Sequence, residues 1–220
     1  MKAKMKTKYL AYLFDFDGTL VDSMPTFTAV MLRILDEYGI SYSDDIVKVI
    51  TPLGYHGTAE HFRKLGVPLG TEELVGLMMR YATDEYTYRI QAKDKVAETL
   101  NFMKKNGISL NVLTASPHVM LDPCLGRLGI LDLFDNVWSC DDFGTTKSDP
   151  KIYAQATEII GRKIGETVFV DDNVNAIKTA KQAGMVCYGI FDPSSADYAE
   201  EMTAASDRYI ISFAELLEEN

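Results

Sequence analysis

The residues best suited to chemistry stand where an apolar run ends in acidic residues. Residues 9–14 read YLAYLF, Asp15 and Asp17 follow two positions apart, and a Gly-Thr pair comes next. In extended backbone, residues i and i+2 point to the same face, so both carboxylates can reach one substrate. Like charges crowded at the end of a buried strand need a cation to relieve their repulsion. We therefore interpret this stretch as part of a cation-assisted site.

Other segments deliver polar residues of complementary types. The run ISLNVLT ends in Thr114, with Ser116 just beyond it, and the run ETVFVDD ends in Asp171 and Asp172. Lys147 lies in a loop ahead of a helix that leads back toward the same edge. Each residue alone is explained by a helix cap, a turn or a solvated side chain. Since ligands bind at the carboxyl edge of parallel strands, their convergence predicts one site.

Alternating strand-like and helix-like segments predict an α/β fold. Four continuous apolar runs are typical of parallel strands buried on both faces: 9–14, 108–114, 166–172 and 185–190. Helix-period segments precede the last three runs, at 93–107, 149–161 and 173–184. This order predicts a Rossmann-like, doubly wound parallel sheet. Pro123 is expected to interrupt the helix that follows Ser116.

Residues 24–90 break this alternation. They contain four helix-like segments with no strand between them: 25–40, 44–50, 55–67 and 71–90. The first strand therefore meets its next partner only after roughly 90 residues, which is too long for an ordinary crossover. We predict a catalytic core formed by residues 1–23 and 91–220, with an α-helical cap of residues 24–90 inserted after the first strand.

Composition indicates which classes of partner and which cellular compartment to expect. The net charge of −10 argues against binding to nucleic acid or to a membrane surface. The apolar run after the N-terminal lysines is too short for an export signal, and no stretch approaches the roughly 18 apolar residues of a membrane helix. Three widely spaced cysteines, with no CxxC pair, indicate thiols in a reducing compartment. We expect a cytoplasmic protein; its oligomeric state is not indicated.

Together these residue types suit phosphoryl transfer, which needs a nucleophile, a proton shuttle and positive charge near the phosphate oxygens. A Mg²⁺ held by Asp15 and the pair 171–172 would neutralise the carboxylates and let one of them approach a phosphate. Lys147 would add positive charge. The Thr114 hydroxyl and nearby backbone N–H groups, that of Ala115 included, would bind phosphate oxygens.

These segments resemble the motifs of the haloacid dehalogenase-like superfamily. DFDGTLVDS looks like its first motif, NVLTAS is similar to the second, Lys147 to the third and VFVDDN to the acidic fourth. The resemblance extends over residues 9–190 and places residues 24–90 where that family carries its cap. Within the family, the chain looks most like the phosphoglycolate-phosphatase and β-phosphoglucomutase branch.

The resemblance implies roles for the acidic residues. Asp15 would be the nucleophile that forms an aspartyl-phosphate, and Asp17 would protonate the leaving oxygen and then activate water. The main-chain carbonyl of Asp17 would join Asp15, Asp171 and Asp172 around Mg²⁺. The family's dehalogenases lack the second aspartate of the first motif, so Asp17 favours phosphate-ester chemistry. We therefore expect a magnesium-dependent phosphatase that acts on a small phosphorylated metabolite.

Two alternatives share this fold. A sugar phosphomutase would use the same core but return the phosphoryl group to the sugar, and a non-catalytic regulator would bind only phosphate and Mg²⁺. The regulator has no use for Asp17. A calcium loop is excluded because its glycine belongs at the sixth position and stands here at the fourth. A two-component receiver domain is disfavoured because its acid pair comes first in the chain, whereas Asp171 and Asp172 come last here.

Overall fold

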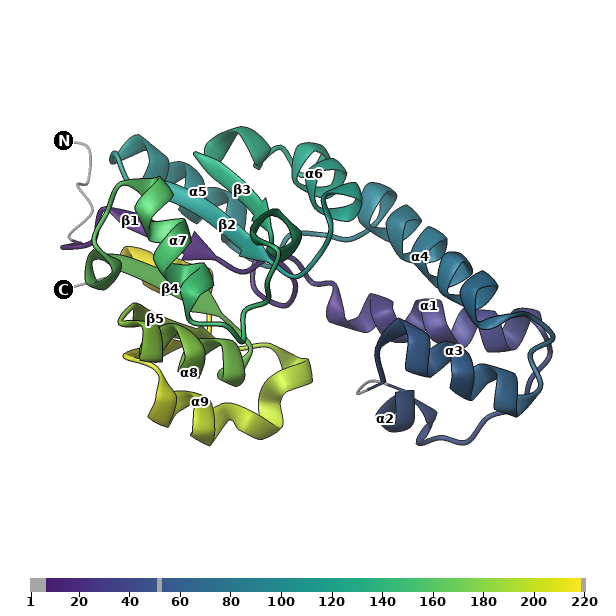
Figure 1. The fold of residues 1–220 in the computed structure, drawn as a ribbon. Helices are drawn as coiled ribbons and strands as arrows, with labels where there is room; N and C mark the ends of the chain where they lie inside the picture. Colours follow the sequence, from purple (N-terminus) through teal and green to yellow (C-terminus); the bar gives the residue numbers. More distant parts are fainter. Residues whose placement is uncertain (1–6, 51–52, 219–220) are drawn as a thin grey trace. The chain divides into compact units, whose positions relative to one another are not determined.

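The computed structural model describes residues 7–50 and 53–218 (Figure 1). The chain divides into two compact units. One comprises the described parts of Met1–Asp22 and Gln91–Asn220, and the other comprises those of Ser23–Ile90. Among the described residues, no helix has the length and apolar character needed to cross a membrane.

The first unit is built on a six-stranded parallel sheet of order β3-β2-β1-β4-β5-β6. The strands are β1 Ala11–Phe14, β2 Ser109–Thr114, β3 Asn136–Ser139, β4 Thr167–Asp171, β5 Val186–Ile190 and β6 Arg208–Ile210. The chain runs outward from β1 through β2 to β3, and then returns to place β4 on the other side of β1. The order therefore reverses beside β1, where ligands bind in sheets of this kind.

Helices cover both faces of this sheet. They are α5 Val96–Lys105, α6 His118–Arg127, α7 Lys151–Ile160, α8 Val174–Ala183 and α9 Ala199–Ala205. Leu13 of β1 and Phe169 of β4 are buried in one cluster with residues of α7 and α8, among them Ile177. Phe14, the next residue of β1, instead lies against Phe213, with ring centroids 5.6 Å apart. Apolar side chains on both faces explain why these strands have continuous apolar sequences.

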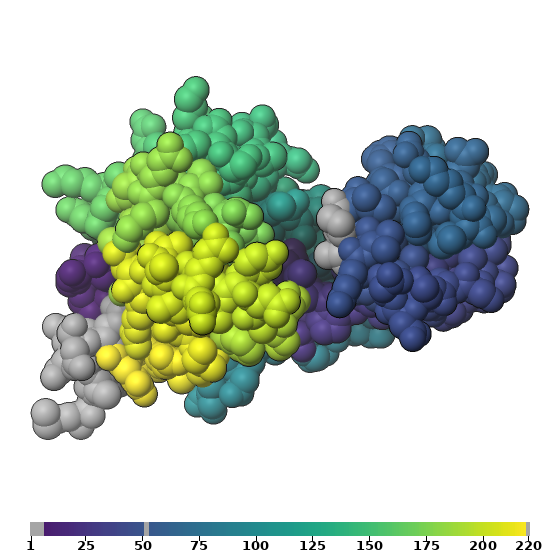
Figure 2. All heavy atoms as spheres, turned by 90° about the horizontal axis from the view of Figure 1, so that it is seen from below, coloured from purple at the N-terminus to yellow at the C-terminus, as the bar shows by residue number. Residues whose placement is uncertain are grey.

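The segments after β4 form a continuous stretch of the unit's surface. Helix α8 contacts α9, and α9 contacts both β6 and the 3₁₀-helix Pro193–Tyr198. These elements lie side by side, coloured from green to yellow in Figure 2. The carboxyl end of β5 therefore leads into a packed segment of the unit, and Asp192 lies between that strand and the 3₁₀-helix.

The predicted fold class is confirmed, and each of the four predicted strands is present with slightly shorter bounds. Strands β3 and β6 were not predicted, because they have only four and three residues and are partly exposed. The expectation for Pro123 was wrong, since it lies inside α6. Because proline has no N–H, the helical hydrogen bond to the Val119 carbonyl is not made. Val119 is exposed, so water can hydrogen-bond to that carbonyl instead.

The second unit is helical in its described residues. It contains α1 Met24–Glu37, α2 Ile46–Ile50, α3 Gly54–Leu65 and α4 Thr71–Tyr88. Their apolar faces form one core, in which Met31, Phe62 and Met78 are fully buried. This unit therefore has its own hydrophobic core, as an inserted domain requires.

The chain leaves and re-enters the sheet unit through two segments that pair with each other. The Asp22 N–H donates to the Gln91 carbonyl at 3.0 Å, and Val21 forms an antiparallel bridge with Ala92. The residues just after Gln91 are consequently held beside the turn that follows β1.

Candidate active site

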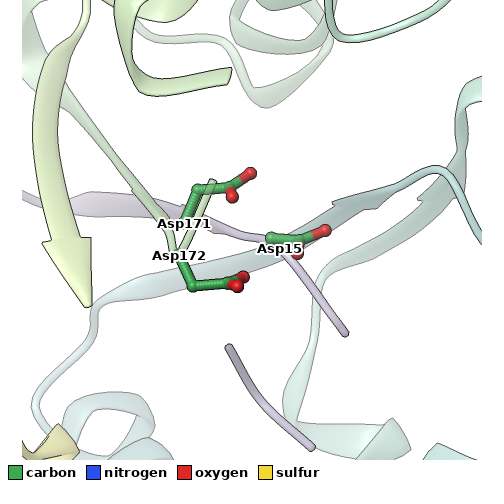
Figure 3. A group of neighbouring side chains, drawn as sticks. All are labelled: Asp15, Asp171 and Asp172. Atoms are coloured by element: carbon green, nitrogen blue, oxygen red, sulfur yellow. The ribbon is translucent and has the colours of Figure 1, made fainter. Parts of the chain in front are cut away.

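Three aspartates meet where β1 and β4 end. Asp15 directly follows β1, and its N–H still donates to the Val170 carbonyl of β4 at 2.9 Å. Asp171 is the last residue of β4, and Asp172 follows it. One carboxylate oxygen from each of the three lies within 4.8 Å of the others. Figure 3 shows the three side chains gathered at this edge, where they are only 6%, 0% and 7% exposed.

Burial makes this trio electrostatically costly. Burial raises the pKa of Asp15 well above its usual value, and the charges of Asp171 and Asp172 act in the same direction against the attraction of Lys147. Burial, followed by the charge of Asp171, raises the pKa of Asp172 to about 7. A divalent cation bound by all three would relieve this repulsion, and Mg²⁺ prefers carboxylate oxygens. The donor set therefore fits a magnesium ion.

Lys147 supplies the positive charge nearest to the trio. Its ammonium donates hydrogen bonds to the carboxylates of Asp15 and Asp171, the latter at 2.8 Å. Burial disfavours this ammonium, but the two carboxylates outweigh that effect and raise its pKa. Tyr153 of α7 holds the segment in place, because its hydroxyl donates to the main-chain carbonyl of Lys147 at 3.0 Å. Lys147 is thus charged and directed at Asp15.

Asp17 has different surroundings from Asp15. Its carboxylate accepts a hydrogen bond of 2.5 Å from the hydroxyl of Ser116, which follows β2. The Ser116 N–H in turn donates to Oγ1 of the buried Thr114 at 3.0 Å, and the neighbouring Ala115 is exposed. The three-carboxylate group found among the described residues does not include Asp17. Two carboxylates only two positions apart therefore face different partners.

The turn after Asp17 lies directly against Asp172. Gly18 has a φ of +71°, and a Cβ added there would lie 2.6 to 2.8 Å from the carboxyl atoms of Asp172. The Thr19 hydroxyl donates to Asp172 Oδ1 at 3.2 Å and accepts from the Asp172 N–H at 3.2 Å. Only glycine suits the first position of this turn, both for its backbone conformation and for its closeness to the carboxylate.

The structure brings the predicted site residues to one edge of the sheet. Lys147 contacts Asp15 and Asp171, and the carboxylates of both lie close to that of Asp172. The sequence did not predict the supporting contacts of Thr19 and Tyr153. Thr19 lies two positions after Asp17, which could have suggested a place near the site. In the sequence, Tyr153 is one residue of an apolar helix face, so no pattern indicated its contact with Lys147.

The chain is similar in sequence to a known family of hydrolases and to several characterised proteins. A family model described as haloacid dehalogenase-like hydrolase matches residues 9–184. The validoxylamine A 7'-phosphate phosphatase of Streptomyces hygroscopicus subsp. limoneus is 26% identical over 194 residues, which are 88% of this chain and 91% of that protein. The pyrophosphatase PpaX of Bacillus velezensis is 29% identical over 182 residues, or 82% of each chain.

A solved structure shows the same fold. A Thermotoga maritima protein, provisionally named a beta-phosphoglucomutase, superposes with a TM-score of 0.82 over 94% of this chain and 96% of that one. The two sequences are 23% identical. At that identity the likeness concerns the fold, and the chemistry must be argued from the residues of this chain.

Proposed function

The chain belongs to the haloacid dehalogenase-like hydrolases, and on that premise we propose that it is a magnesium-dependent phosphatase of small phosphomonoesters. The observation that carries the proposal is the contact of Lys147 with Asp15 inside a buried group of three carboxylates. A group of carboxylates that could hold a cation, with a lysine directed at one of them, suits attack on a phosphate.

Asp15 is the nucleophile in this proposal. Its carboxylate oxygen attacks phosphorus, the bond from phosphorus to the ester oxygen breaks, and an aspartyl-phosphate forms. Held by Asp15, Asp171 and Asp172, Mg²⁺ would supply the positive charge that lets a carboxylate approach a phosphate dianion. Lys147 neutralises further charge on the transferring group from its position beside Asp15.

Asp17 moves the proton in both halves of the reaction. It first protonates the departing ester oxygen, which leaves as an alcohol, and it then takes a proton from the water that attacks the aspartyl-phosphate. Ser116 holds this carboxylate by a hydrogen bond of 2.5 Å. The Thr114 hydroxyl and the Ala115 N–H are assigned to phosphate oxygens, and the main-chain carbonyl of Asp17 is assigned to the metal.

The helical unit is included in the proposal as the cap that chooses the substrate. It is inserted in the sequence between β1 and β2, so it interrupts the catalytic core without contributing a strand to the sheet. The small phosphorylated compounds in the names of the relatives support a metabolite as substrate. Three buried, unpaired cysteine thiols support a reducing compartment such as the cytoplasm.

A panel of phosphorylated compounds tests this function. The purified chain is incubated with Mg²⁺ and with phosphoglycolate, several sugar phosphates, pyrophosphate and β-glucose 1-phosphate, the last with and without a bisphosphate activator. Release of inorganic phosphate from a monoester supports the proposal. An isomerised sugar phosphate without free phosphate would identify a phosphomutase instead, and no turnover of any compound would favour a non-catalytic binder.

A further inference from the structure

Lys93 makes a set of contacts that the reaction described above does not use. It lies in the segment through which the chain re-enters the sheet unit, and its side chain is only 18% exposed. Its ammonium donates to the Gly18 carbonyl at 2.7 Å, to the Phe191 carbonyl at 2.7 Å and to Asp192 Oδ2 at 3.0 Å. These three acceptors use all three ammonium hydrogens.

The hydrogen bonds of Lys93 connect the Gly18 turn to the carboxyl end of β5. The β5 end of this connection is formed by Phe191 and Asp192. Asp192 follows that strand closely, and its side chain is buried. Its other carboxylate oxygen accepts hydrogen bonds from the Ser194 N–H at 2.9 Å and from the Ser194 hydroxyl at 2.5 Å. Because β5 pairs with β4, this end of the connection moves with the strand that carries Asp171 and leads into Asp172.

The other end of the connection is the turn that contacts Asp172. The Lys93 side chain holds the carbonyl of Gly18, and its main-chain N–H donates to the Leu20 carbonyl at 3.0 Å. Gly18 lies so close to the Asp172 carboxyl group that a Cβ has no room there. A small displacement of this turn must therefore change the position of Asp172 or the hydrogen bonds it makes to Thr19.

We propose that Lys93 is a positioning residue for the metal site: it fastens the Gly18 turn to the end of β5 and so sets where Asp172 presents its carboxylate. The inference rests on the proposed function, since it requires Asp172 to be a ligand of Mg²⁺. Partners of metal ligands commonly change metal affinity or activity about 10-fold to 100-fold when they are removed.

Loss of the Lys93 charge and loss of its hydrogen bonds should have opposite effects on the affinity for Mg²⁺. Removing a positive charge near the acidic trio would by itself strengthen the binding of a cation. Loss of the connection to the Gly18 turn would weaken it, because the carboxylates would no longer be held in one arrangement. A weaker Mg²⁺ affinity after removal of Lys93 therefore reports on position.

The deciding variant is Lys93→Met combined with Asp192→Asn. The pair of substitutions leaves the net charge unchanged and avoids a buried Asp192 without its partner, which would destabilise the fold. The matched control is Lys95→Met combined with Glu98→Gln, which deletes an exposed pair 3.0 Å apart two residues further on. Mg²⁺ affinity is measured without substrate, from the rise in melting temperature over a Mg²⁺ titration, and kcat and KM are measured at saturating Mg²⁺.

The expected result is an Mg²⁺ dissociation constant about 10-fold or more above that of the wild type, with the control unchanged. A lower melting temperature with unchanged Mg²⁺ affinity would mean a merely structural role and would overturn the inference alone. A wild type that neither binds Mg²⁺ nor releases phosphate would overturn the proposed function, and the inference with it.

Two single variants cover the case in which the double variant does not fold. Asp192→Asn leaves the Lys93 bonds to the Gly18 and Phe191 carbonyls in place. Mg²⁺ affinity close to that of the wild type in this variant, together with a weaker affinity in Lys93→Met, supports the positioning role, whereas an unchanged or stronger affinity in Lys93→Met overturns it. A loss of about 10-fold or more in Asp192→Asn would show that charge dominates and would overturn the role of Lys93.

Discussion

The hydroxyl of Ser116 donates a hydrogen bond of 2.5 Å to the carboxylate of Asp17, which lies 99 residues earlier in the chain. The bond connects the loop after β2 to the turn after β1. The group of three carboxylates found among the described residues, Asp15, Asp171 and Asp172, does not include Asp17. Ser116 therefore orients the carboxylate to which we assign the proton transfers.

Ser116→Ala is expected to lower kcat about 10-fold to 100-fold with little change in KM, because a small misplacement of a reacting group costs up to that much. Steady-state hydrolysis at saturating Mg²⁺ measures the effect. Ser206→Ala is the matched control, since that hydroxyl donates to the Met202 carbonyl away from the trio. Equal kcat values for Ser116→Ala and the wild type would contradict the assigned role of Ser116.

Asp15→Asn is expected to reduce turnover of p-nitrophenyl phosphate by at least about 10³-fold, because an amide cannot act as the nucleophile. The variant should keep the wild-type circular dichroism spectrum, since asparagine has the same shape. Asp132→Asn, at an exposed position of the same unit, is the control. Substantial activity in Asp15→Asn would require another nucleophile.

Removal of metal by EDTA is expected to stop hydrolysis, and added Mg²⁺ should restore it. Mg²⁺ should also raise the melting temperature progressively as its concentration increases, because it binds the folded site and relieves repulsion among the buried aspartates. Asp172→Asn should strongly reduce this thermal shift. Hydrolysis that is indifferent to the chelator would exclude the metal from the reaction.

Comparing Gly18→Ala with Gly129→Ala distinguishes the effect of backbone strain from the effect of a new contact with Asp172. Both glycines have positive φ values, +71° and +69°, so each alanine is expected to cost about 1–2 kcal/mol of stability. A Cβ at position 129 has no neighbour within 4 Å, whereas one at position 18 would meet Asp172. Only Gly18→Ala should also weaken Mg²⁺ binding, by about 10-fold or more. Equal Mg²⁺ affinities in the two variants would contradict this account.

His118 is expected to make stability depend on pH. Its Nδ1 lies 2.9 Å from Asp122 Oδ1 and its Nε2 lies 2.8 Å from Asp142 Oδ2, and these hydrogen bonds raise the pKa of His118. With a folded-state pKa above the unfolded value of about 6.5, the stabilisation is complete below about pH 6.5 and is lost as the pH rises through the folded-state pKa.

The free energy of unfolding of His118→Asn should therefore fall furthest below that of the wild type near pH 5.5, and the gap should shrink by pH 9. The ring is 40% exposed, so the difference should stay below about 1 kcal/mol. Denaturant unfolding at several pH values measures it, with His61→Asn as control. A gap that widened with increasing pH would contradict the sign of the shift.

Much of the fold could be predicted because parallel strands buried on both faces have a strong local signature. Leu13 and Phe14 point to opposite faces and both find apolar partners, so the run 9–14 reads as a strand without knowledge of its neighbours. The short edge strands β3 and β6 lack that signature. The prediction that Pro123 interrupts the helix was wrong, because a helix tolerates one missing hydrogen bond where its surface is exposed.

By itself, the sequence determined which residue types stand at the ends of the strands. Since parallel strands end at a common edge, it followed that Asp15, Thr114 and Asp171 would be neighbours. Tertiary structure decided which side chains touch: Lys147 on Asp15, Ser116 on Asp17 and Lys93 on Gly18. Those contacts join segments 75 to 132 residues apart. Their geometry depends on how helices and returning loops pack on the sheet, which no local pattern of residues encodes.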